Sequence, residues 1–290
     1  GAYAFRACPA LETVIFPRGL EDILEGVLSD CPRLVSVDCS QCASLRYIGG
    51  GAFQSCGALE IVAFPPSIGT IDEGVISHCT TLAHVDLRAC TSLRVISAGV
   101  LRACDALETI LFPPSLEEIG DGALSECPML VNVDLSACAA LRRIGSAFRR
   151  CFALECVLFP PRLRVIGDDA FSYCKVAKVD VSACASLRVI GRAAFRGCDA
   201  LESVLFPPGL EQIGHSVLSD CPMLVHVDLG ACALLRVFSD YVFSNCSALA
   251  SMLFPPHLEA IGHGALSDCP KLRRADLSAC ASLRVIGASA

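Results

Sequence analysis

Residues 79–126 read CTTLAHVDLRACTSLRVISAGVLRACDALETILFPPSLEEIGDGALSE, and they divide into two unlike halves that each begin with a cysteine. The same pair recurs along all 290 residues, because cysteines return at alternating steps of 23 and 24 or 25 residues. The full repeat is therefore 47 or 48 residues long. A fixed period of this kind is the signature of a solenoid, in which each rung contacts only its neighbours.

The rungs carry the pattern L-x-x-V-x-(L/F) three residues after the cysteine, as in Leu107, Ile110 and Phe112. In the eighth rung the first position is Val176, only two residues after Cys174. Because side chains alternate along a strand, positions four and six should point into the core and position five should face solvent. A second apolar pair follows, such as Leu116 and Ile119, and then a short outer turn. That turn is too short for a stable free helix, so we expect a single helical or 3₁₀ turn there.

These rungs resemble leucine-rich repeats, which have 20–29 residues per rung. The stretches IGRAAFRGCDAL (190–201) and FPPSLEEIG (112–120) are similar to the bacterial BspA-like subclass, also called the Treponema pallidum type. The resemblance implies an α/β repeat fold, a right-handed solenoid of about twelve rungs. A parallel sheet would form the concave side, and short turns with 3₁₀ or helical turns the convex side. We expect one domain over residues 1–290, with both ends cut within a repeat.

Composition and charge exclude several classes of protein. The net charge of −7 opposes nucleic-acid binding, which needs a basic surface. No apolar run approaches the ~18 residues of a transmembrane helix. The first residues, GAYAFRACPA, do not form a signal peptide.

The hexapeptide VDLSAC at 133–138 places an acid, a hydroxyl and a thiol together, but six related copies occur in the chain. The slot of Ser136 is filled by Arg88 in one copy and by Gly230 in another, so no array of nucleophiles is present. The slot of Cys138 turns the chain out of the strand, where a small thiol packs against backbone groups. These observations predict no catalytic residues and no enzyme activity.

The 20 cysteines raise the questions of disulfides and of zinc. Stacked rungs offer every cysteine the same neighbour above and below, so nothing selects a disulfide partner, and we expect reduced, buried thiols. Zinc needs clustered ligands. The one suitable spacing, Cys39-x-x-Cys42, includes a core position, so we predict neither a metal site nor another cofactor. Cys156 is the one thiol expected on the solvent face of the sheet.

Position five of the strands offers the best candidate binding surface. Aspartate occupies it in the longer rungs and mostly an aliphatic residue in the shorter ones. In one interpretation the aspartates accept hydrogen bonds from their own following turns; in the other they form a recognition stripe with the exposed aliphatic side chains. Position three varies from rung to rung. The candidate binding residues from both positions are Asp86, Leu111, Asp134, Leu158, Asp180, Leu205, Asp228, His84, Lys178 and His226.

Two further features are architectural. A column after the second leucine mostly alternates Arg and Glu, which predicts a ladder of surface ion pairs rather than a site for sulfated or phosphorylated ligands. Phe-Pro-Pro recurs in the shorter rungs, and because proline cannot donate a ladder hydrogen bond, we expect short strands there. Open sheet edges would favour end-to-end association between copies.

The resemblance implies a recognition module, adhesin-like, that binds an unknown protein or extracellular ligand through its concave face and lies at the cell surface or is secreted. A binder of a small hydrophobic ligand in an apolar groove is one alternative. An intracellular scaffold or effector in the cytoplasm is the other.

Overall fold

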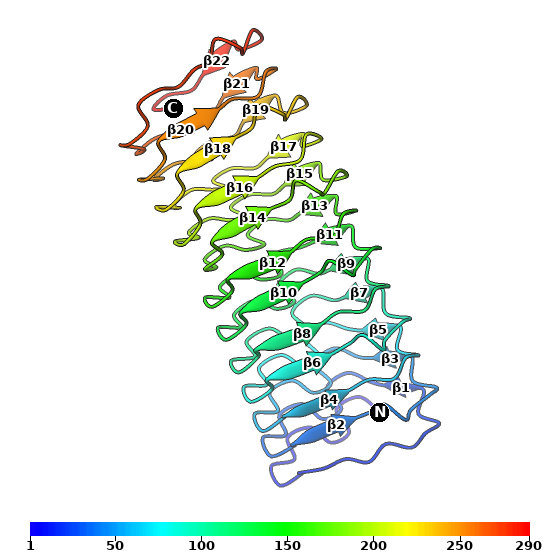
Figure 1. Ribbon diagram of the computed structural model, residues 1–290. Coiled ribbons are helices and arrows are strands. Elements are labelled where there is room, and N and C mark those ends of the chain that lie inside the picture. Colours follow the sequence, from blue (N-terminus) through cyan, green and yellow to red (C-terminus); the bar gives the residue numbers. More distant parts are fainter. The chain divides into compact units, whose positions relative to one another are not determined.

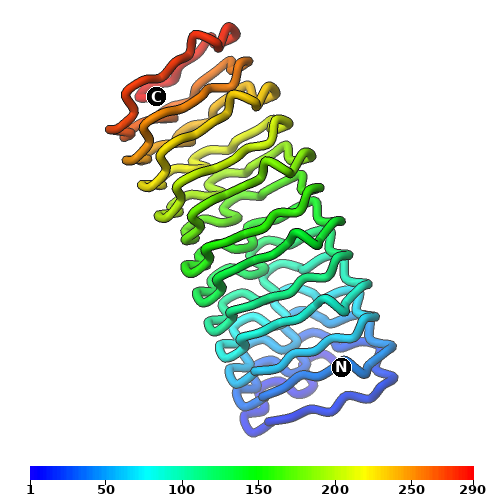
Figure 2. The backbone as a smooth tube through the Cα atoms, viewed as in Figure 1, coloured from blue at the N-terminus to red at the C-terminus, as the bar shows by residue number.

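The computed structural model describes residues 1–290, which form 22 short β-strands and no helix (Figure 1). Two compact units can be distinguished. Unit 1 comprises residues 1–141 and 147–154, and unit 2 comprises residues 142–146 and 155–290. Each is a parallel β-solenoid, and the chain makes about eleven turns in all, which Figure 2 traces one after another.

The first set of strands coincides with the L-x-x-V-x-L pattern and confirms the predicted parallel strands. They pair in separate short sheets of two or four strands, which are together called the first sheet below. All these strands are three residues long, with the middle residue buried. In unit 1 they are β2 (Ser36–Asp38), β4 (Ile61–Ala63), β6 (His84–Asp86), β8 (Thr109–Leu111) and β10 (Asn132–Asp134). In unit 2 they are β12 (Cys156–Leu158), β14 (Lys178–Asp180), β16 (Ser203–Leu205), β18 (His226–Asp228) and β20 (Ser251–Leu253). Single bridges at Thr13 and Ala275 continue the pattern in one further rung of each unit.

A second parallel sheet forms at the residues that end the second apolar pair, where no strand was predicted. Its strands are two residues long and, except in β22, hold a buried residue, usually isoleucine, at the second position. Unit 1 contributes β1 (Asp22–Ile23), β3 (Tyr47–Ile48), β5 (Thr70–Ile71), β7 (Val95–Ile96) and β9 (Glu118–Ile119). Unit 2 contributes β11 (Arg143–Ile144), β13 (Val165–Ile166), β15 (Val189–Ile190), β17 (Gln212–Ile213), β19 (Val237–Phe238), β21 (Ala260–Ile261) and β22 (Val285–Ile286).

The outer turns correct one prediction, because they are neither helical nor 3₁₀. Most place two residues, four apart, in the left-handed region, as Gly99 (φ 59°) and Ala103 (φ 55°) do. A right-handed helix needs successive residues at negative φ, so a left-handed residue every fourth position prevents one from forming.

Hydrogen bonds between rungs take the place of helical ones in these turns. The backbone N–H groups of Gly99, Leu101 and Ala103 donate to carbonyls of the next rung at N···O distances of 3.0, 2.8 and 2.9 Å. The same three-bond pattern repeats along each unit, so alternate peptide groups of the turn stack in three columns. The remaining donors close local turns, as Ser125 N–H does on the carbonyl of Gly122 at 3.1 Å.

The core lies between the two sheets and the outer turns. The inward residues of both apolar patterns are almost fully buried, and phenylalanines fill the space beneath the outer turns. In unit 2 the rings of Phe171 and Phe195, one rung apart, stack with centroids 5.4 Å apart. Repetition of the same residue at the same position therefore supplies the contacts between rungs, as the period predicted.

Candidate functional site: the exposed face of the first sheet

The exposed face of the first sheet, called the strand face below, consists of the position-three and position-five side chains. In unit 2 the strand register sets Asp180 beside Leu205, Leu205 beside Asp228, and Asp228 beside Leu253. Leu205 and Leu253 are 41% and 51% exposed, so apolar side chains reach solvent between the acids. In unit 1 Asp86 lies beside Leu111, which is 40% exposed.

Every position-five aspartate also shapes the turn that follows it. Oδ1 of Asp134 accepts the backbone N–H of Ser136 at 2.9 Å and its hydroxyl at 2.6 Å. The other five aspartates accept the backbone N–H two residues ahead in the same way: Asp38, Asp86, Asp180, Asp228 and Asp276. The interpretation as local acceptors is therefore confirmed, and Oδ1 is the atom engaged in each case. The serines serve as donors in this turn, as expected of turn residues.

These hydrogen bonds lower the pKa values of several of the carboxylates. The Ser182 side chain, followed by its backbone N–H and Lys178, holds the pKa of Asp180 below its usual value. The Ser278 hydroxyl acts in the same way on Asp276 and lowers its pKa to about 2. A hydrogen bond to the ionised form favours that form, so these aspartates stay negative well into the acidic range.

Position three adds polar side chains to the strand face. His84 Nδ1 lies 2.8 Å from the hydroxyl of Thr109 on the next strand, and His226 makes the same contact with Ser251. Lys178 Nζ lies 3.4 Å from Oδ2 of Asp180. All ten predicted binding residues are exposed on the first sheet, those of unit 1 in β6, β8 and β10 and those of unit 2 in β12, β14, β16 and β18.

The cysteines lie away from this face, with one exception. All 20 are free, 17 are buried, and Cys156 alone is exposed, where the alternation of β12 predicted it. No group of three or more His, Cys, Asp or Glu side chains is arranged to hold a metal ion.

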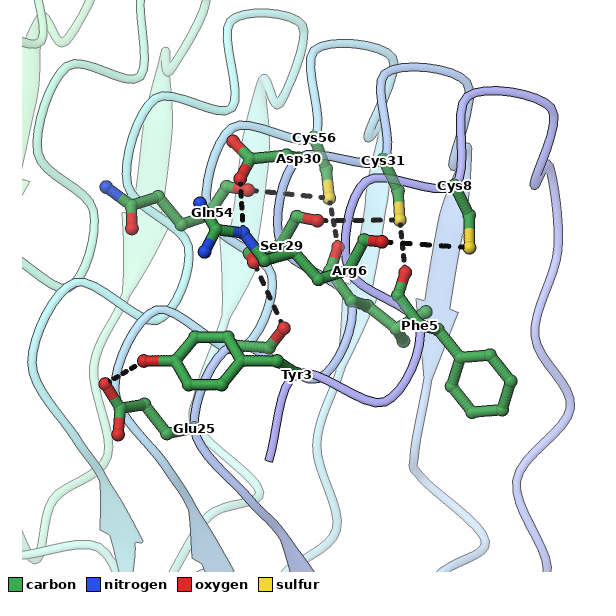
Figure 3. Close-up of polar contacts among 12 residues, drawn as sticks. Tyr3, Phe5, Arg6, Cys8, Glu25, Ser29, Asp30, Cys31, Gln54 and Cys56 are labelled. Carbon is green, nitrogen blue, oxygen red and sulfur yellow. Dashed lines mark hydrogen bonds and ion pairs between the residues drawn. The ribbon is translucent and has the colours of Figure 1, made fainter. Parts of the chain in front are cut away.

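The row of rung-opening thiols bonds to the outer turns. Cys31 donates to the carbonyl of Phe5 at 3.2 Å, and Cys56 donates to the carbonyl of Leu28 at 3.2 Å (Figure 3). The pattern repeats with Cys79 and Phe53 at 3.3 Å. Each accepting carbonyl lies between the peptide columns that bond from rung to rung, so the thiol provides a partner for a buried backbone group.

The second thiol row, in the slot of Cys138, meets the proline turns. Cys138 donates to the carbonyl of Pro113 at 3.6 Å, and Cys184 to that of Pro160 at 3.3 Å. The longer rung therefore supplies a donor to the turn of the preceding shorter rung. The prediction that this cysteine packs against backbone groups is confirmed.

Burial makes these thiols hard to ionise. It raises the pKa of Cys79 to about 12 and that of Cys138 to about 11, and it holds the pKa of Cys198 well above its ordinary value. The thiolate is the reactive form, so the buried cysteines are poor nucleophiles.

Comparisons with known proteins agree with this architecture. The pattern of the BspA type leucine rich repeat region matches residues 1–93, 87–185 and 180–290. The chain belongs to the BspA-type leucine-rich repeat family. The resemblance inferred from the sequence is thus confirmed. Proteins of this repeat type from bacterial surface families suggest protein–protein recognition. None of the curated proteins matches the chain.

Three solved structures are similar to this chain to different degrees. A leucine-rich repeat protein from Bacteroides ovatus is 25% identical with a TM-score of 0.72, over 99% of this chain and 80% of that chain. One from Eubacterium ventriosum is 17% identical with a TM-score of 0.50, over 93% and 79%. One from T. pallidum is 20% identical with a TM-score of 0.36, over 93% and 86%.

The predicted ladder of ion pairs on the flank of the repeats is confirmed in three places. Arg94 lies 3.7 Å from Glu117, Arg188 lies 3.2 Å from Glu211, and Arg236 lies 3.3 Å from Glu259. The sequence showed this alternation, but it gave no sign of the carbonyl groups that the same arginines also contact. Arg94 Nη1, for example, donates to the carbonyl of Thr91 at 3.1 Å.

Proposed function

We propose that this chain is a non-enzymatic recognition module that binds a protein through the strand face. The observation that carries the proposal is the register of unit 2, where exposed leucines alternate with exposed aspartates on neighbouring strands. Apolar surface that remains exposed on a regular scaffold is typical of a contact surface. A partner segment with apolar side chains between basic ones would complement it in both shape and charge.

The aspartates are suited to this role because they are already held in place. Oδ1 of Asp228 accepts the N–H of Gly230 at 2.9 Å, which fixes the carboxylate. A side chain that is ordered before binding loses little entropy when a partner arrives, so more of the interaction energy is available for binding. The second oxygen of Asp228 makes no hydrogen bond within the protein and can accept one from a lysine or arginine of the partner.

The test is capture of binding proteins with a variant in which Leu158 and Asp180 are both replaced by lysine. Both residues lie on the strand face of unit 2, and both are exposed. Lysine at these positions removes apolar contact and reverses the local charge, so bound partners should be lost or bind at least about tenfold more weakly.

A matched control replaces Val237 and Asp199 by lysine. Both are exposed residues of unit 2 that lie outside the first sheet, and the change in net charge is the same. Partners should be retained by this control. If every bound protein is unaffected by the Leu158 and Asp180 change, or if the control loses the same partners, the strand face is not the binding surface.

Family membership supports a location at the cell surface or in the secreted fraction, and we propose that location. The structure contains no helix that could cross a membrane. Thiol titration of the native protein from its source tests this proposal against an intracellular scaffold or effector. A protein whose cysteines must stay reduced would favour the intracellular alternative. A small hydrophobic ligand on the exposed leucines is the remaining alternative, and retention of apolar probes by the lysine variant would oppose it.

A further inference from the structure

One short rung breaks the flank ladder with two positive charges. In the shorter rungs the column after the second leucine holds glutamate at 21, 117, 211 and 259 and glycine at 69, but arginine at 164. Two residues earlier, where the other shorter rungs have glycine, serine or histidine, the same rung has Arg162. Its sequence, at 159–167, is FPPRLRVIG. The corresponding shorter rung of unit 1, at 112–120, reads FPPSLEEIG.

The backbone register brings a third arginine beside these two. The N–H of Arg164 donates to the carbonyl of Arg142 at 2.8 Å, and the N–H of Arg188 donates to the carbonyl of Arg164 at 3.0 Å. The pairing of Arg143 with Val165 and of Val165 with Val189 fixes the same order. Adjacent parallel strands are ~4.8 Å apart, so Arg142, Arg164 and Arg188 follow one another at this spacing.

The three arginines Arg142, Arg162 and Arg164 are exposed and have no carboxylate partner. At several other places in the column the guanidinium group is held. Arg94 contacts Glu117 and two carbonyls, and Arg188 contacts Glu211 and the carbonyl of Ala185. At Arg142 the glutamate is replaced by Arg164, so the ion pair becomes a repulsion between like charges. The cluster therefore lacks the carboxylate partner that Arg94, Arg188 and Arg236 find within the chain.

We propose that Arg142, Arg162 and Arg164, called the arginine cluster below, bind the sulfate groups of an anionic polysaccharide. Guanidinium groups match the planar, bidentate geometry of oxyanions. The site is an open surface on which a single exposed ion pair contributes little, so one free anion would be held poorly. A chain that carries sulfates at intervals can engage the three groups together, and their effects then combine.

The charge of the whole chain favours a glycan over a nucleic acid. Duplex nucleic acid carries a charge every ~1.7 Å and needs an extended basic surface. Here the net charge is −7, and Glu211, paired with Arg188 at 3.2 Å, marks the return of the alternating ladder. A flexible polysaccharide needs no extended basic surface, because it can place just a few of its sulfates on so small a cluster. This site is separate from the strand face, and its occupation does not depend on the proposed function.

The test is binding to immobilised heparin, measured by surface plasmon resonance at low and at physiological salt. The variant replaces Arg162 by serine and Arg164 by glutamate, which gives this rung the residues that the corresponding rung has at 115 and 117. Arg142 then gains a carboxylate neighbour, as Arg94 has in Glu117, so the fold should be retained. A circular dichroism spectrum and a melting curve check this directly.

Heparin should bind the unaltered protein, chemically desulfated heparin should not, and the variant should bind heparin at least about tenfold more weakly. The control replaces Arg18 by serine and Arg33 by glutamate, which removes the same net charge from unit 1, and it should bind as the unaltered protein does. Equal heparin binding by the folded variant, equal loss in the control, or no heparin binding at all would overturn the proposal. Tighter binding of single- or double-stranded DNA, dependent on the same arginines, would overturn the glycan assignment.

Discussion

Mild alkali should unfold this protein, because its buried thiols are neutral only while the chain is folded. In unit 1 burial holds the pKa of four rung-opening thiols well above the ordinary value, to about 12 for Cys79 and higher for Cys104, Cys127 and Cys151. A cysteine in the unfolded chain has a pKa of about 8.5. Below that pH both states are protonated and the full stability is present. As the pH rises toward the folded pKa, the unfolded state binds fewer protons, so stability falls.

The size of the effect follows from the difference in proton binding. At pH 10 each such thiol loses about 1.5 to 2 kcal/mol relative to neutral pH, because the unfolded thiol is ionised and the folded one is not. Four thiols together lose about 6 to 8 kcal/mol, which is comparable with the whole stability of a typical domain, about 5 to 15 kcal/mol. The expected result is cooperative unfolding between about pH 9 and pH 10.5, with roughly one proton released by each of these four thiols.

Urea denaturation followed by far-ultraviolet circular dichroism, in the presence of a reducing agent, measures the free energy of unfolding at each pH. Its slope against pH counts the protons directly and does not depend on the starting stability. A variant with Cys79 and Cys127 replaced by serine keeps a hydrogen-bond donor that does not ionise, so the slope should fall by about two protons. A slope unchanged by these substitutions, or a protein that remains equally stable at pH 10, would refute the assignment of the thiols.

Two further predictions concern the acids and the outer turns. The pKa of Asp180 is depressed in the folded state, so its contribution to stability is present above the unfolded pKa of about 3.9 and is lost as the pH falls through the folded value. The Asp180→Asn variant should therefore show a smaller fall of the urea midpoint below about pH 4. An unaltered profile would contradict this. Replacement of Ala103, at φ 55°, by glycine should raise the free energy of unfolding by about 0.5 to 1 kcal/mol, whereas Gly122→Ala, at φ 67°, should lower it by about 1 kcal/mol. The added methyl group at 122 meets no atom closer than 3.4 Å, so the backbone angle alone is tested, and equal melting temperatures for the two variants would show that it costs little.

Period-two alternation made the strand face predictable from the sequence. Val133 and Leu135 are buried while Asp134 is exposed, as the pattern requires, and the same reasoning placed Cys156 in solvent. The second sheet could not be found in this way, because a two-residue strand such as β7 contains no alternation to recognise. Its pairing depends on the rung spacing, which becomes visible only when successive rungs are superimposed.

The outer turns failed as a prediction for a different reason. A recurring glycine at 26, 51, 74, 99 and 122 was a signal for left-handed backbone, but the partner position holds residues such as Ala103 and Glu126 that normally avoid it. Their conformation is imposed by bonds to the neighbouring rung, which no local propensity reports. The thiol donors were likewise invisible, because each acceptor lies about 25 residues away along the chain, as for Cys79 and Phe53 with a separation of 26.

The peptide columns of the outer turns give the repeat a polarity. Every column bond runs from an N–H of one rung to a carbonyl of the next, as from Gly26 to Gly50 and from Gly51 to Glu73. The peptide dipoles of these columns therefore add along each unit, as peptide dipoles do along a helix, and they do not cancel. One rung surface offers donors and the opposite surface offers acceptors. Two copies that met through identical rung surfaces, as twofold symmetry requires, would oppose donor to donor, so stacking of these repeats is compatible only with head-to-tail order.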